Sequence, residues 1–352
     1  MKILSVVGAR PQFVKAAAVS RVLRRDHDEI LVHTGQHYDD NMSKVFFEEL
    51  DIPPPDFHLG VGSGTHGAQT GAMLAGIEKL LLAEPPEWVL VYGDTNSTLA
   101  GALSAAKLRC KVAHVEAGLR SYNRAMPEEI NRVVADHLSD LLFCPSETAV
   151  ANLAAEGITQ GVVIVGDVMA DVLRTSADRA RGRPALYEQT GLRERGYLLA
   201  TVHRAENTDD SVRLRNILAA FDALDEPVIF PVHPRTRKAM DALGYSPPGH
   251  VHLLEPVGYL DMTGLEQAAR MILTDSGGIQ KEAYWLGVPC LTLRDETEWM
   301  ETVKAGWNSL TGADSDRIVQ AVRSFRPPSA RPELYGDGNA AVRISQALTG
   351  RR

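Results

Sequence analysis

The segment KILSVVGARPQFVKAAAVSRVLRR (residues 2–25) sets the expectation for the fold. It begins with the apolar run KILSVV, whose composition is typical of a strand that is buried on both faces of a parallel sheet. A glycine turn follows, and Pro11 then stands in the first turn of the next apolar stretch, where proline favours the start of a helix. The segment therefore predicts a strand, a tight turn and a helix, which is the repeating unit of an α/β fold.

The same alternation continues along the rest of the chain. In the first half, further strands are expected at residues 29–34, 88–92, 111–115, 140–144 and 162–166. In the second half, strands are expected at residues 197–202, 227–232, 251–255, 270–274 and 289–293. Helices are expected between them, for example at 96–108 and 127–138. Such alternation predicts parallel sheets that are covered by helices on both faces.

The length of the chain predicts two domains, because 352 residues exceed what one hydrophobic core usually supports. The stretch 174–196 is charged, is punctuated by glycine and proline and lacks a strand, so we place the connection there or just before it. We expect Rossmann-like domains at residues 1–170 and 171–337, with 338–352 forming a helix that packs back on the first. The expected fold class is α/β, with two Rossmann-like domains facing across a cleft.

The composition excludes several classes of protein. A formal net charge of −8 argues against nonspecific nucleic-acid binding, which needs an electropositive surface. No run approaches the ~20 apolar residues of a membrane span, and KILSVV is too short for a signal peptide. A soluble, cytoplasmic protein without a nucleic-acid or membrane partner is therefore expected. Cys110, Cys144 and Cys290 form no CxxC pair and are expected to be buried free thiols.

Acidic residues follow neighbouring strands in the first half, where ligands of open α/β sheets bind. Asp94 and Glu116 each come directly after an expected strand, and Glu116 has no helix to cap. Glu128 and Arg132 stand one turn apart on one helix face, so the arginine would hold that carboxylate ionised. Helix capping is the alternative for Asp94, although Thr95 or Asn96 could serve as the cap equally well, and one of Glu128 and Glu129 needs no role beyond pairing with the helix dipole. Three acids still exceed what capping requires, so the pattern predicts an acid–base site.

Basic residues near the first turn suggest an anion site. Arg10 stands at the start of the first expected helix, where backbone N–H groups and the helix dipole favour a phosphate. Lys15 lies one turn further on and could reach the same anion, although a surface lysine explains it equally well.

The strongest local signal in the second half is the run DSGGIQKE at residues 275–282. A strand ends there, Gly277 and Gly278 let backbone N–H groups approach a ligand, and a helix begins, which together predict a diphosphate cradle beside Ser276. Glu282 follows one turn later, where a carboxylate can accept hydrogen bonds from both hydroxyls of a ribose. His203 follows an earlier strand and, because it titrates near neutrality, could assist a departing phosphate.

Three other patterns are interpreted as structural. The run GSGTHG at residues 62–67 matches G-x-G-x-x-G but does not close the first strand–helix turn, so no dinucleotide site and no nicotinamide cofactor is predicted. His250 and His252 lack an apparent third ligand, so no metal is predicted. His233 is interpreted as a histidine satisfied at a strand end.

The ordered motifs GARPQ-x-x-K, TGQH, GDT-x-S-T, H-x-EAGLRS, MPEE-x-NR, T-x-HR-x-EN and DSGG-x-x-KEA resemble the non-hydrolysing UDP-N-acetylglucosamine 2-epimerases. The resemblance runs from about residue 2 to residue 310 and implies a two-domain fold of the glycosyltransferase-B type, a homodimer and no cofactor. It implies UDP contacts at Arg10, Ser276, Gly277, Gly278 and Glu282, with His203 near the diphosphate. It implies catalytic roles for Asp94, Glu116, Glu128 and His203, with Lys15 and Arg132 close by.

The chemistry of C2 inversion agrees with these residues. The C2 proton is not adjacent to a carbonyl, so a carboxylate removes it at reasonable cost only as the C1–O bond to UDP breaks. Elimination of UDP gives a 2-acetamidoglucal, and re-addition of the proton on the other face gives the manno isomer. This route needs donors at the diphosphate and carboxylates that take and return a proton. The acids are assigned these roles as a group.

The stretch GQHYDDNMSKVFFEEL at residues 35–50 departs from the common family pattern. It puts activation by substrate in doubt, and it also resembles a branch that acts on UDP-2,3-diacetamido-glucuronic acid. Lys44, Arg120 and Arg124 are possible partners for the C6 carboxylate of such a substrate, although a solvated surface explains each of them. A UDP-sugar glycosyltransferase is the alternative from another class, because the same fold hosts such enzymes.

Overall fold

The computed structural model describes residues 1–36, 52–182 and 186–350. These residues form two compact units, Met1–Arg174 with Tyr335–Arg352, and Thr175–Leu334. The chain first passes between the units within helix α7 (Val168–Arg181), so the helix itself makes the connection. The limits differ by a few residues from those expected at 170 and 337.

Unit 1 contains a parallel sheet in the order β3-β2-β1-β4-β5-β6-β7, counted over the described residues. Its strands are β1 (Lys2–Val7), β2 (Asp28–His33), β3 (Phe57–His58), β4 (Trp88–Tyr92), β5 (Lys111–Val115), β6 (Leu141–Cys144) and β7 (Val162–Ile164). The sequence predicted each of these strands except β3, which is two residues long, exposed, and confined to the edge of the sheet.

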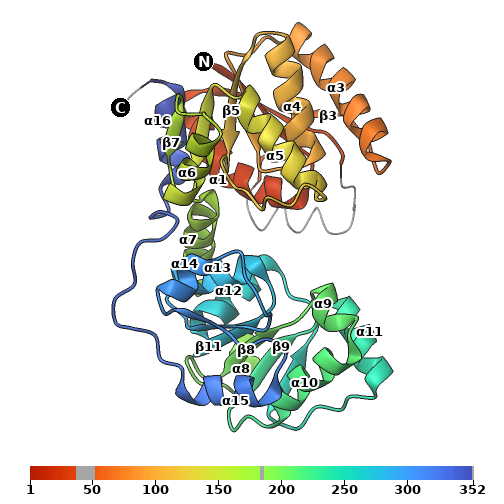
Figure 1. The fold of residues 1–352 in the computed structure, drawn as a ribbon, viewed down its shortest axis with the longest axis vertical. Helices are drawn as coiled ribbons and strands as arrows, with labels where there is room; N and C mark the ends of the chain where they lie inside the picture. Colours follow the sequence, from red (N-terminus) through yellow and green to blue (C-terminus); the bar gives the residue numbers. More distant parts are fainter. Residues whose placement is uncertain (37–51, 183–185, 351–352) are drawn as a thin grey trace. The chain divides into compact units, whose positions relative to one another are not determined.

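The helices of unit 1 fill the connections between its strands. Those described are α1 (Arg10–Asp26), α3 (His66–Ala83), α4 (Asn96–Lys107), α5 (Pro127–Leu138), α6 (Glu147–Ala155), the first part of α7, and α16 (Ala340–Leu348). Helices α3, α4 and α5 pack side by side, and the C-terminal helix α16 lies against α1 (Figure 1). The Asp171 carboxylate accepts hydrogen bonds from the backbone N–H groups of Ala340 and Ala341, and this fixes the start of α16.

Alternating side chains of the strands build the core of unit 1. Leu4 and Val6 of β1 pack with Val89 and Val91 of β4 under helices α3 and α4. Every one of these side chains is inaccessible to solvent. Burial of this apolar surface, at ~25 cal/mol per Å², favours the folded sheet and fixes its register.

Unit 2 contains a second parallel sheet, in the order β10-β9-β8-β11-β12-β13 over its described residues. Its strands are β8 (Leu198–Thr201), β9 (Val228–Pro231), β10 (Val251–Leu254), β11 (Met271–Thr274), β12 (Cys290–Thr292) and β13 (Asn308–Leu310). The sequence predicted all of them except the short edge strand β13.

Helices also connect the strands of unit 2. Those described are α8 (Leu186–Gln189), α9 (Ala205–Thr208), α10 (Ser211–Asp222), α11 (Pro234–Leu243), α12 (Tyr259–Ala268), α13 (Gly277–Leu286), α14 (Met300–Lys304) and α15 (Ser315–Ser324). Helix α10 packs beside α15, and α12 packs beside α13.

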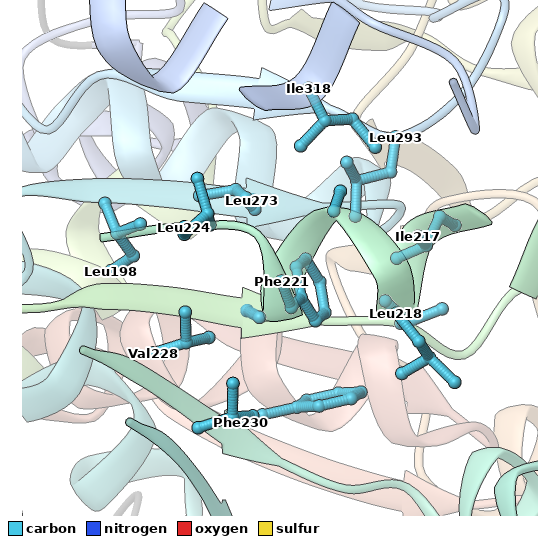
Figure 2. Close-up of a cluster of buried hydrophobic side chains, with 14 of the residues drawn as sticks. Leu198, Ile217, Leu218, Phe221, Leu224, Val228, Phe230, Leu273, Leu293 and Ile318 are labelled. Atoms are coloured by element: carbon cyan, nitrogen blue, oxygen red, sulfur yellow. The ribbon is translucent and has the colours of Figure 1, made fainter. Parts of the chain in front are cut away.

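The two faces of the second sheet carry separate apolar clusters. Leu198 and Ala200 of β8 belong to the cluster under α10 and α15, whereas Leu199 belongs to the cluster under α12 and α13. Figure 2 shows the first cluster, in which the rings of Phe221 and Phe230 meet edge to face with their centroids 5.6 Å apart. The period of two along β8 therefore places helices on both faces, as the alternation of strands and helices predicts.

Two further expectations concern the cysteines and the membrane. Cys144 and Cys290 are buried free thiols, whereas Cys110 is half-buried, so the expectation of burial is correct for two of the three. No helix in the described part of the chain is both long and apolar enough to cross a lipid bilayer.

Candidate active site

The turn between β1 and α1 is held by Gln12, a side chain for which no role was predicted. Gln12 is buried, and its Oε1 accepts hydrogen bonds from the backbone N–H groups of Gly8 (2.8 Å) and Ala9 (3.0 Å). Its Nε2 donates to the Tyr92 carbonyl of β4 at 2.7 Å. The Gly8 and Ala9 amides are therefore not available to an anion, which corrects part of the phosphate interpretation of this turn. Arg10 opens α1 and is exposed.

Gly8 is required at this turn by lack of space. A Cβ at this position would lie 2.1 Å from both Ser97 Oγ and Thr34 Oγ1, far closer than any side chain tolerates. The glycine thus lets the ends of β1, β2 and α4 converge.

Lys15 and Glu116 form an ion pair at the carboxyl end of the sheet. Lys15 projects from α1, and Glu116 directly follows β5. Burial alone would lower the pKa of the Lys15 ammonium, but Glu116, with contributions from Asp167 and Asp94, raises it above its usual value. Lys15 is therefore a cation at neutral pH, and its side chain is directed at Glu116 rather than toward Arg10.

The backbone of Glu116 has an unusual conformation. Its φ angle is +71°, in the left-handed region that residues other than glycine seldom adopt. The N–H groups of Glu116 and Ala117 both donate to the Phe143 carbonyl of β6, and these bonds hold the conformation. Such strained residues cluster at functional sites, because the surrounding structure must compensate for them. Nothing in the local sequence indicates this strain.

Asp94 is paired with Arg132 of α5, which also contacts Glu129 at 3.1 Å. The Asn131 side chain donates to the Asp94 carbonyl at 3.0 Å, so α5 holds both the backbone and the side chain of this residue. The expected pairing of Arg132 with Glu128 is wrong, because α5 turns Glu129 rather than Glu128 toward the arginine.

Glu128 and Glu129 differ sharply in their surroundings. Glu129 is buried and accepts hydrogen bonds from Ser121 N, Ser121 Oγ and Tyr122 N at 2.8–2.9 Å. Burial alone would raise the pKa of its carboxyl, but these bonds and Arg132 lower it below its usual value. Glu128 is exposed. Glu129 is thus the acid of this turn that serves the structure, and Glu128 is the one left for another role.

Arg120 does not have the solvated position expected of it. Its guanidinium is 1% exposed and donates to Asp136 Oδ2 and to both carboxylate oxygens of Glu156, at 2.7 Å in each case. A guanidinium that already pairs with two internal carboxylates is not available to a substrate. The prediction that Arg120 binds the C6 carboxylate of a uronate substrate is therefore wrong. Arg124 is exposed. Lys44 and the stretch from His37 to residue 50 lie outside the described residues.

In unit 2, a buried aspartate fixes the loop that carries His203. Asp275 follows β11 and accepts hydrogen bonds from the N–H groups of His203 and Arg204 at 3.0 Å and from the Asn207 side chain at 3.1 Å. No role was predicted for Asp275 from the sequence. The sequence does contain one signal for it. Asp275 is a carboxylate at the end of a buried strand, and it is not needed as a helix cap, because Ser276 is the N-cap residue of α13.

The start of α13 is open on one side and closely bordered on the other. Ser276 is the N-cap residue, and a Cβ at Gly278 would meet no atom closer than 3.9 Å. A Cβ at Gly277 would lie 3.3 Å from Trp299 Nε1 and 3.6 Å from Arg204 Nη2. An indole N–H and a guanidinium, both of which favour an anion, thus border the amides at the helix N-terminus. The Glu298 carboxylate also borders this position, with Oε2 3.8 Å from the same Cβ.

Glu282 lies one turn into α13 beside two polar groups of α12. Its Oε1 accepts a hydrogen bond from the Tyr259 hydroxyl at 3.0 Å. Burial, followed by the proximity of Glu282, raises the pKa of the Glu266 carboxyl well above its usual value. Two carboxyl groups thus lie close together beside the start of α13, and a negative charge on Glu266 is disfavoured.

The residues interpreted as structural have structural surroundings. His233 caps α11 by accepting from the Arg235 N–H at 3.2 Å. His250 Nε2 lies 3.1 Å from the Phe221 carbonyl, and no group of three metal-ligating side chains occurs among the described residues. The G-x-G-x-x-G run covers the end of the loop after β3 and the first two residues of α3, and a Cβ at Gly62, Gly64 or Gly67 meets nothing within 4 Å. No close packing therefore requires these glycines.

Comparison with known proteins identifies the family of this chain. The family model described as UDP-N-acetylglucosamine 2-epimerase matches residues 21–349. The chain belongs to this family of epimerases. Its members are isomerases, and this membership confirms the resemblance seen in the motifs.

Full-length relatives bear two different names. A protein of Methanococcus maripaludis named a UDP-N-acetylglucosamine 2-epimerase homolog is 52% identical over 99% of both chains. A protein of Pseudomonas aeruginosa named UDP-2,3-diacetamido-2,3-dideoxy-D-glucuronate 2-epimerase is 50% identical over the same shares. The 2-epimerase family thus includes near relatives with different named substrates.

Solved structures define the fold class of the family. The Methanocaldococcus jannaschii UDP-GlcNAc 2-epimerase, solved in complex with UDP-GlcNAc and UDP, matches with a TM-score of 0.83 and 44% identity over 99% of this chain and 100% of that one. A calicheamicin glycosyltransferase matches with a TM-score of 0.58 at 15% identity, which shows the fold alone. The expected α/β fold of the glycosyltransferase-B type is therefore confirmed.

Proposed function

We propose that this chain converts UDP-N-acetylglucosamine to UDP-N-acetylmannosamine by eliminating UDP and adding it back. The observation that carries the proposal is the pair of carboxylates at neighbouring strand ends. Asp94 follows β4 and Glu116 follows β5, the two strands pair in parallel, and each acid has a cationic partner. Inversion at C2 requires groups that take a proton on one face of the sugar and return one on the other.

Each unit has its own part in the proposed reaction. In unit 2, the amides at the start of α13, with Ser276, Gly277 and Gly278, bind the diphosphate, and Glu282 binds the ribose. In unit 1, Glu116, Asp94 and Glu128 take and return the C2 proton, while Lys15 pairs with Glu116 and Arg132 pairs with Asp94. Arg10 and His203 add charge and a proton donor for the leaving phosphate.

The proposed reaction conserves atoms and charge. A carboxylate removes the C2 proton while the C1–O bond breaks, and the bonding electrons leave with the β-phosphate of UDP. The C2–H electrons form the C1=C2 bond of 2-acetamidoglucal. A proton then adds to C2 on the opposite face as the UDP oxygen attacks C1. The uncharged glucal and the UDP anion are both retained, so no water enters and no cofactor is consumed.

The reaction is tested by incubating the protein with UDP-N-acetylglucosamine in deuterated water and recording proton NMR spectra. The expected result is a UDP-linked manno product that carries deuterium at C2, because the proton returned to C2 comes from a group that exchanges with solvent. Release of UDP in step with sugar consumption would instead indicate a hydrolase or a transferase. Unchanged C2 protons would refute the proposal.

UDP-2,3-diacetamido-2,3-dideoxy-glucuronate is a second candidate substrate. It is favoured by the relative of that name, which is 50% identical over the full length. The internal pairing of Arg120 removes one of the cations proposed for its carboxylate. Running the same experiment with each nucleotide sugar decides between them, and the substrate with the higher kcat/KM is the assigned one. The homodimer implied by the resemblance stays a prediction.

The affinity for UDP-N-acetylglucosamine is expected to increase as the pH falls from 8 to 6. Burial lowers the pKa of the His203 imidazole, Asp275 raises it and His233 lowers it, with a net decrease. The free ring is thus mostly neutral at pH 7, and a bound diphosphate favours the imidazolium. Binding then takes up a proton and strengthens below the pKa of the bound state, by up to about tenfold for each pH unit.

This pH dependence is measured by calorimetric titration, and the substitution His203→Asn is expected to reduce it. The substitution His137→Asn, at an exposed position in unit 1, serves as the control and should retain the wild-type dependence. Equal pH profiles for the wild type and His203→Asn would show that His203 does not contact the diphosphate.

A further inference from the structure

His114 lies in the middle of β5 and is completely buried, although the rest of this strand is apolar after its first residue. Its ring makes two short hydrogen bonds. Nδ1 lies 2.7 Å from Asp136 Oδ1 of α5, and Nε2 lies 2.7 Å from the Gly93 carbonyl oxygen. The proposed reaction assigns no role to this residue, and a lone polar side chain in a buried strand needs a reason.

The two partners of the ring decide its protonation. A peptide carbonyl only accepts hydrogen bonds, and an ionised carboxylate also only accepts. A neutral imidazole has one N–H, so it could satisfy one of these acceptors and would leave a lone pair facing the other. Both hydrogen bonds form together only when Nδ1 and Nε2 each carry a proton.

Asp136 is ionised and cannot supply the missing proton. Its Oδ2 accepts from Arg120 Nη1 at 2.7 Å and from the Gly118 N–H at 3.1 Å. Burial alone would raise the pKa of this carboxyl, but the hydrogen bonds and charges of His114 and Arg120 lower it below its usual value. The carboxylate is thus a fixed negative charge beside the ring.

The other groups around the ring do not compete for its protons. In β6, which pairs with β5, Cys144 is the titratable residue, and burial raises the pKa of its thiol to about 12. From the loop after β5, Glu116 is directed to Lys15, and Arg120 is saturated by Asp136 and Glu156. The acceptors that face His114 are therefore Asp136 and the Gly93 carbonyl.

The ring connects the two loops that carry the acids. Gly93 has a φ angle of +61°, its N–H donates to the Val115 carbonyl, and its carbonyl accepts from His114, directly before Asp94. On the other side, Asp136 holds the N–H of Gly118, two residues after Glu116. A Cβ at Gly93 would lie 3.3 Å from Glu116 Oε2, so the two loops are in contact.

We infer that His114 is doubly protonated and acts as a positioning residue, fixing the Gly93–Asp94 turn against the Glu116 loop. Its charge is balanced by the Asp136 carboxylate, which lies 2.7 Å from Nδ1. The importance of this positioning for turnover rests on the proposed function, whereas the double protonation stands on the hydrogen-bond geometry alone.

The protonation is tested by 15N NMR of the wild-type protein labelled at the histidine rings. We expect one ring with two protonated nitrogens at neutral pH, and the substitution His114→Gln assigns this signal by removing it. A neutron structure of the wild-type protein provides the same information without a variant and should show deuterium on both ring nitrogens. An unprotonated ring nitrogen at residue 114 in either measurement overturns the inference.

The positioning role is tested by kinetics on two variants. A glutamine at position 114 can donate to one of the two acceptors but not reach both, so His114→Gln is expected to lower kcat by about 100-fold and to leave UDP affinity unchanged. In Asp136→Asn, a neutral ring can accept from the amide and still donate to Gly93, so kcat should fall less.

The two variants separate the inference from the proposed function. A His114→Gln protein with the wild-type kcat, or an Asp136→Asn protein that is the more impaired of the two, contradicts the positioning role. The exposed His137→Gln variant on the same helix as Asp136 is the control for general effects of histidine replacement. If the wild-type protein itself shows no exchange at C2, the proposed function fails while the NMR result stands.

Discussion

Replacing Glu116 with glutamine is expected to lower kcat for C2 inversion by about 10²–10⁴-fold, the usual contribution of a general acid or base. The amide has nearly the shape of the carboxylate but cannot take a proton from the sugar. Because the proposed diphosphate donors other than Arg10 belong to unit 2, the affinity for UDP should be retained. The measurement pairs initial rates of C2 deuterium exchange with calorimetric titration of UDP.

A chemical effect of this substitution must be separated from a structural one. Glu116 is the counterion of Lys15, so the variant leaves a buried ammonium without its partner. The melting temperature is therefore recorded for Glu116→Gln alone and for its combination with Lys15→Met. Glu78→Gln, on the exposed side of α3, is the control for the loss of one carboxylate. A folded Glu116→Gln protein with the wild-type rate would remove Glu116 from the mechanism.

The same comparison extends to the other acids. Asp94→Asn and Glu128→Gln should also lose turnover by orders of magnitude and keep UDP affinity. Glu128→Gln should leave the melting temperature unchanged, because the side chain is exposed. Glu129→Gln should lower it, because this carboxylate holds the Ser121–Tyr122 turn. If Glu128→Gln and Glu129→Gln changed turnover and melting temperature in the same way, the assignment of a catalytic role to Glu128 and a structural role to Glu129 would be wrong.

Replacing Arg120 with methionine is expected to destabilise unit 1 by about 3–5 kcal/mol, the usual cost of removing one partner from a buried ion pair. Methionine fills much of the space of the arginine stem but leaves Asp136 and Glu156 without their shared cation. Because the chain has two units and need not unfold in one step, the shift is measured by calorimetry as a change in the unit 1 transition.

A matched substitution tests the reason for this effect. Arg124 lies four residues further along and is exposed, so Arg124→Met should leave the unit 1 transition unchanged. Equal stability of the Arg120 and Arg124 variants would show that the internal ion pairs contribute little. Wild-type stability of Arg120→Met with selective loss of a uronate substrate would restore Arg120 as a substrate ligand.

Much of the fold follows from local patterns. The strands with continuous apolar runs are recognisable because burial on both faces leaves no other composition possible. The two missed strands, β3 and β13, are two and three residues long. They belong to the sheets through backbone hydrogen bonds to a neighbouring strand, and a pairing of that kind leaves little trace in side-chain pattern.

Those residues of the candidate site that are recognisable from their position directly after a strand were predictable from the sequence. Asp94 and Glu116 follow buried strands of the first sheet, and the run from Ser276 to Glu282 follows a buried strand of the second. In each sheet, the parallel topology brings such residues to the carboxyl edge of that sheet. Partnerships across the structure were not predictable. Lys15 and Glu116 are far apart in the sequence, and the pairing of Arg132 with Asp94 instead of Glu128 depends on which face of α5 meets the sheet.

The sequence by itself thus determined the α/β class, most of the strands and the residue types available for chemistry, because apolar periodicity and strand-end position are local properties. The tertiary structure alone decided which charges neutralise one another. In the folded structure, Arg120 is in a buried ion pair and Glu116 has a left-handed backbone conformation. His114 lies between two hydrogen-bond acceptors. The physical reason is that hydrogen bonds and ion pairs form between groups that only the packing of separate elements brings within about 3 Å of one another.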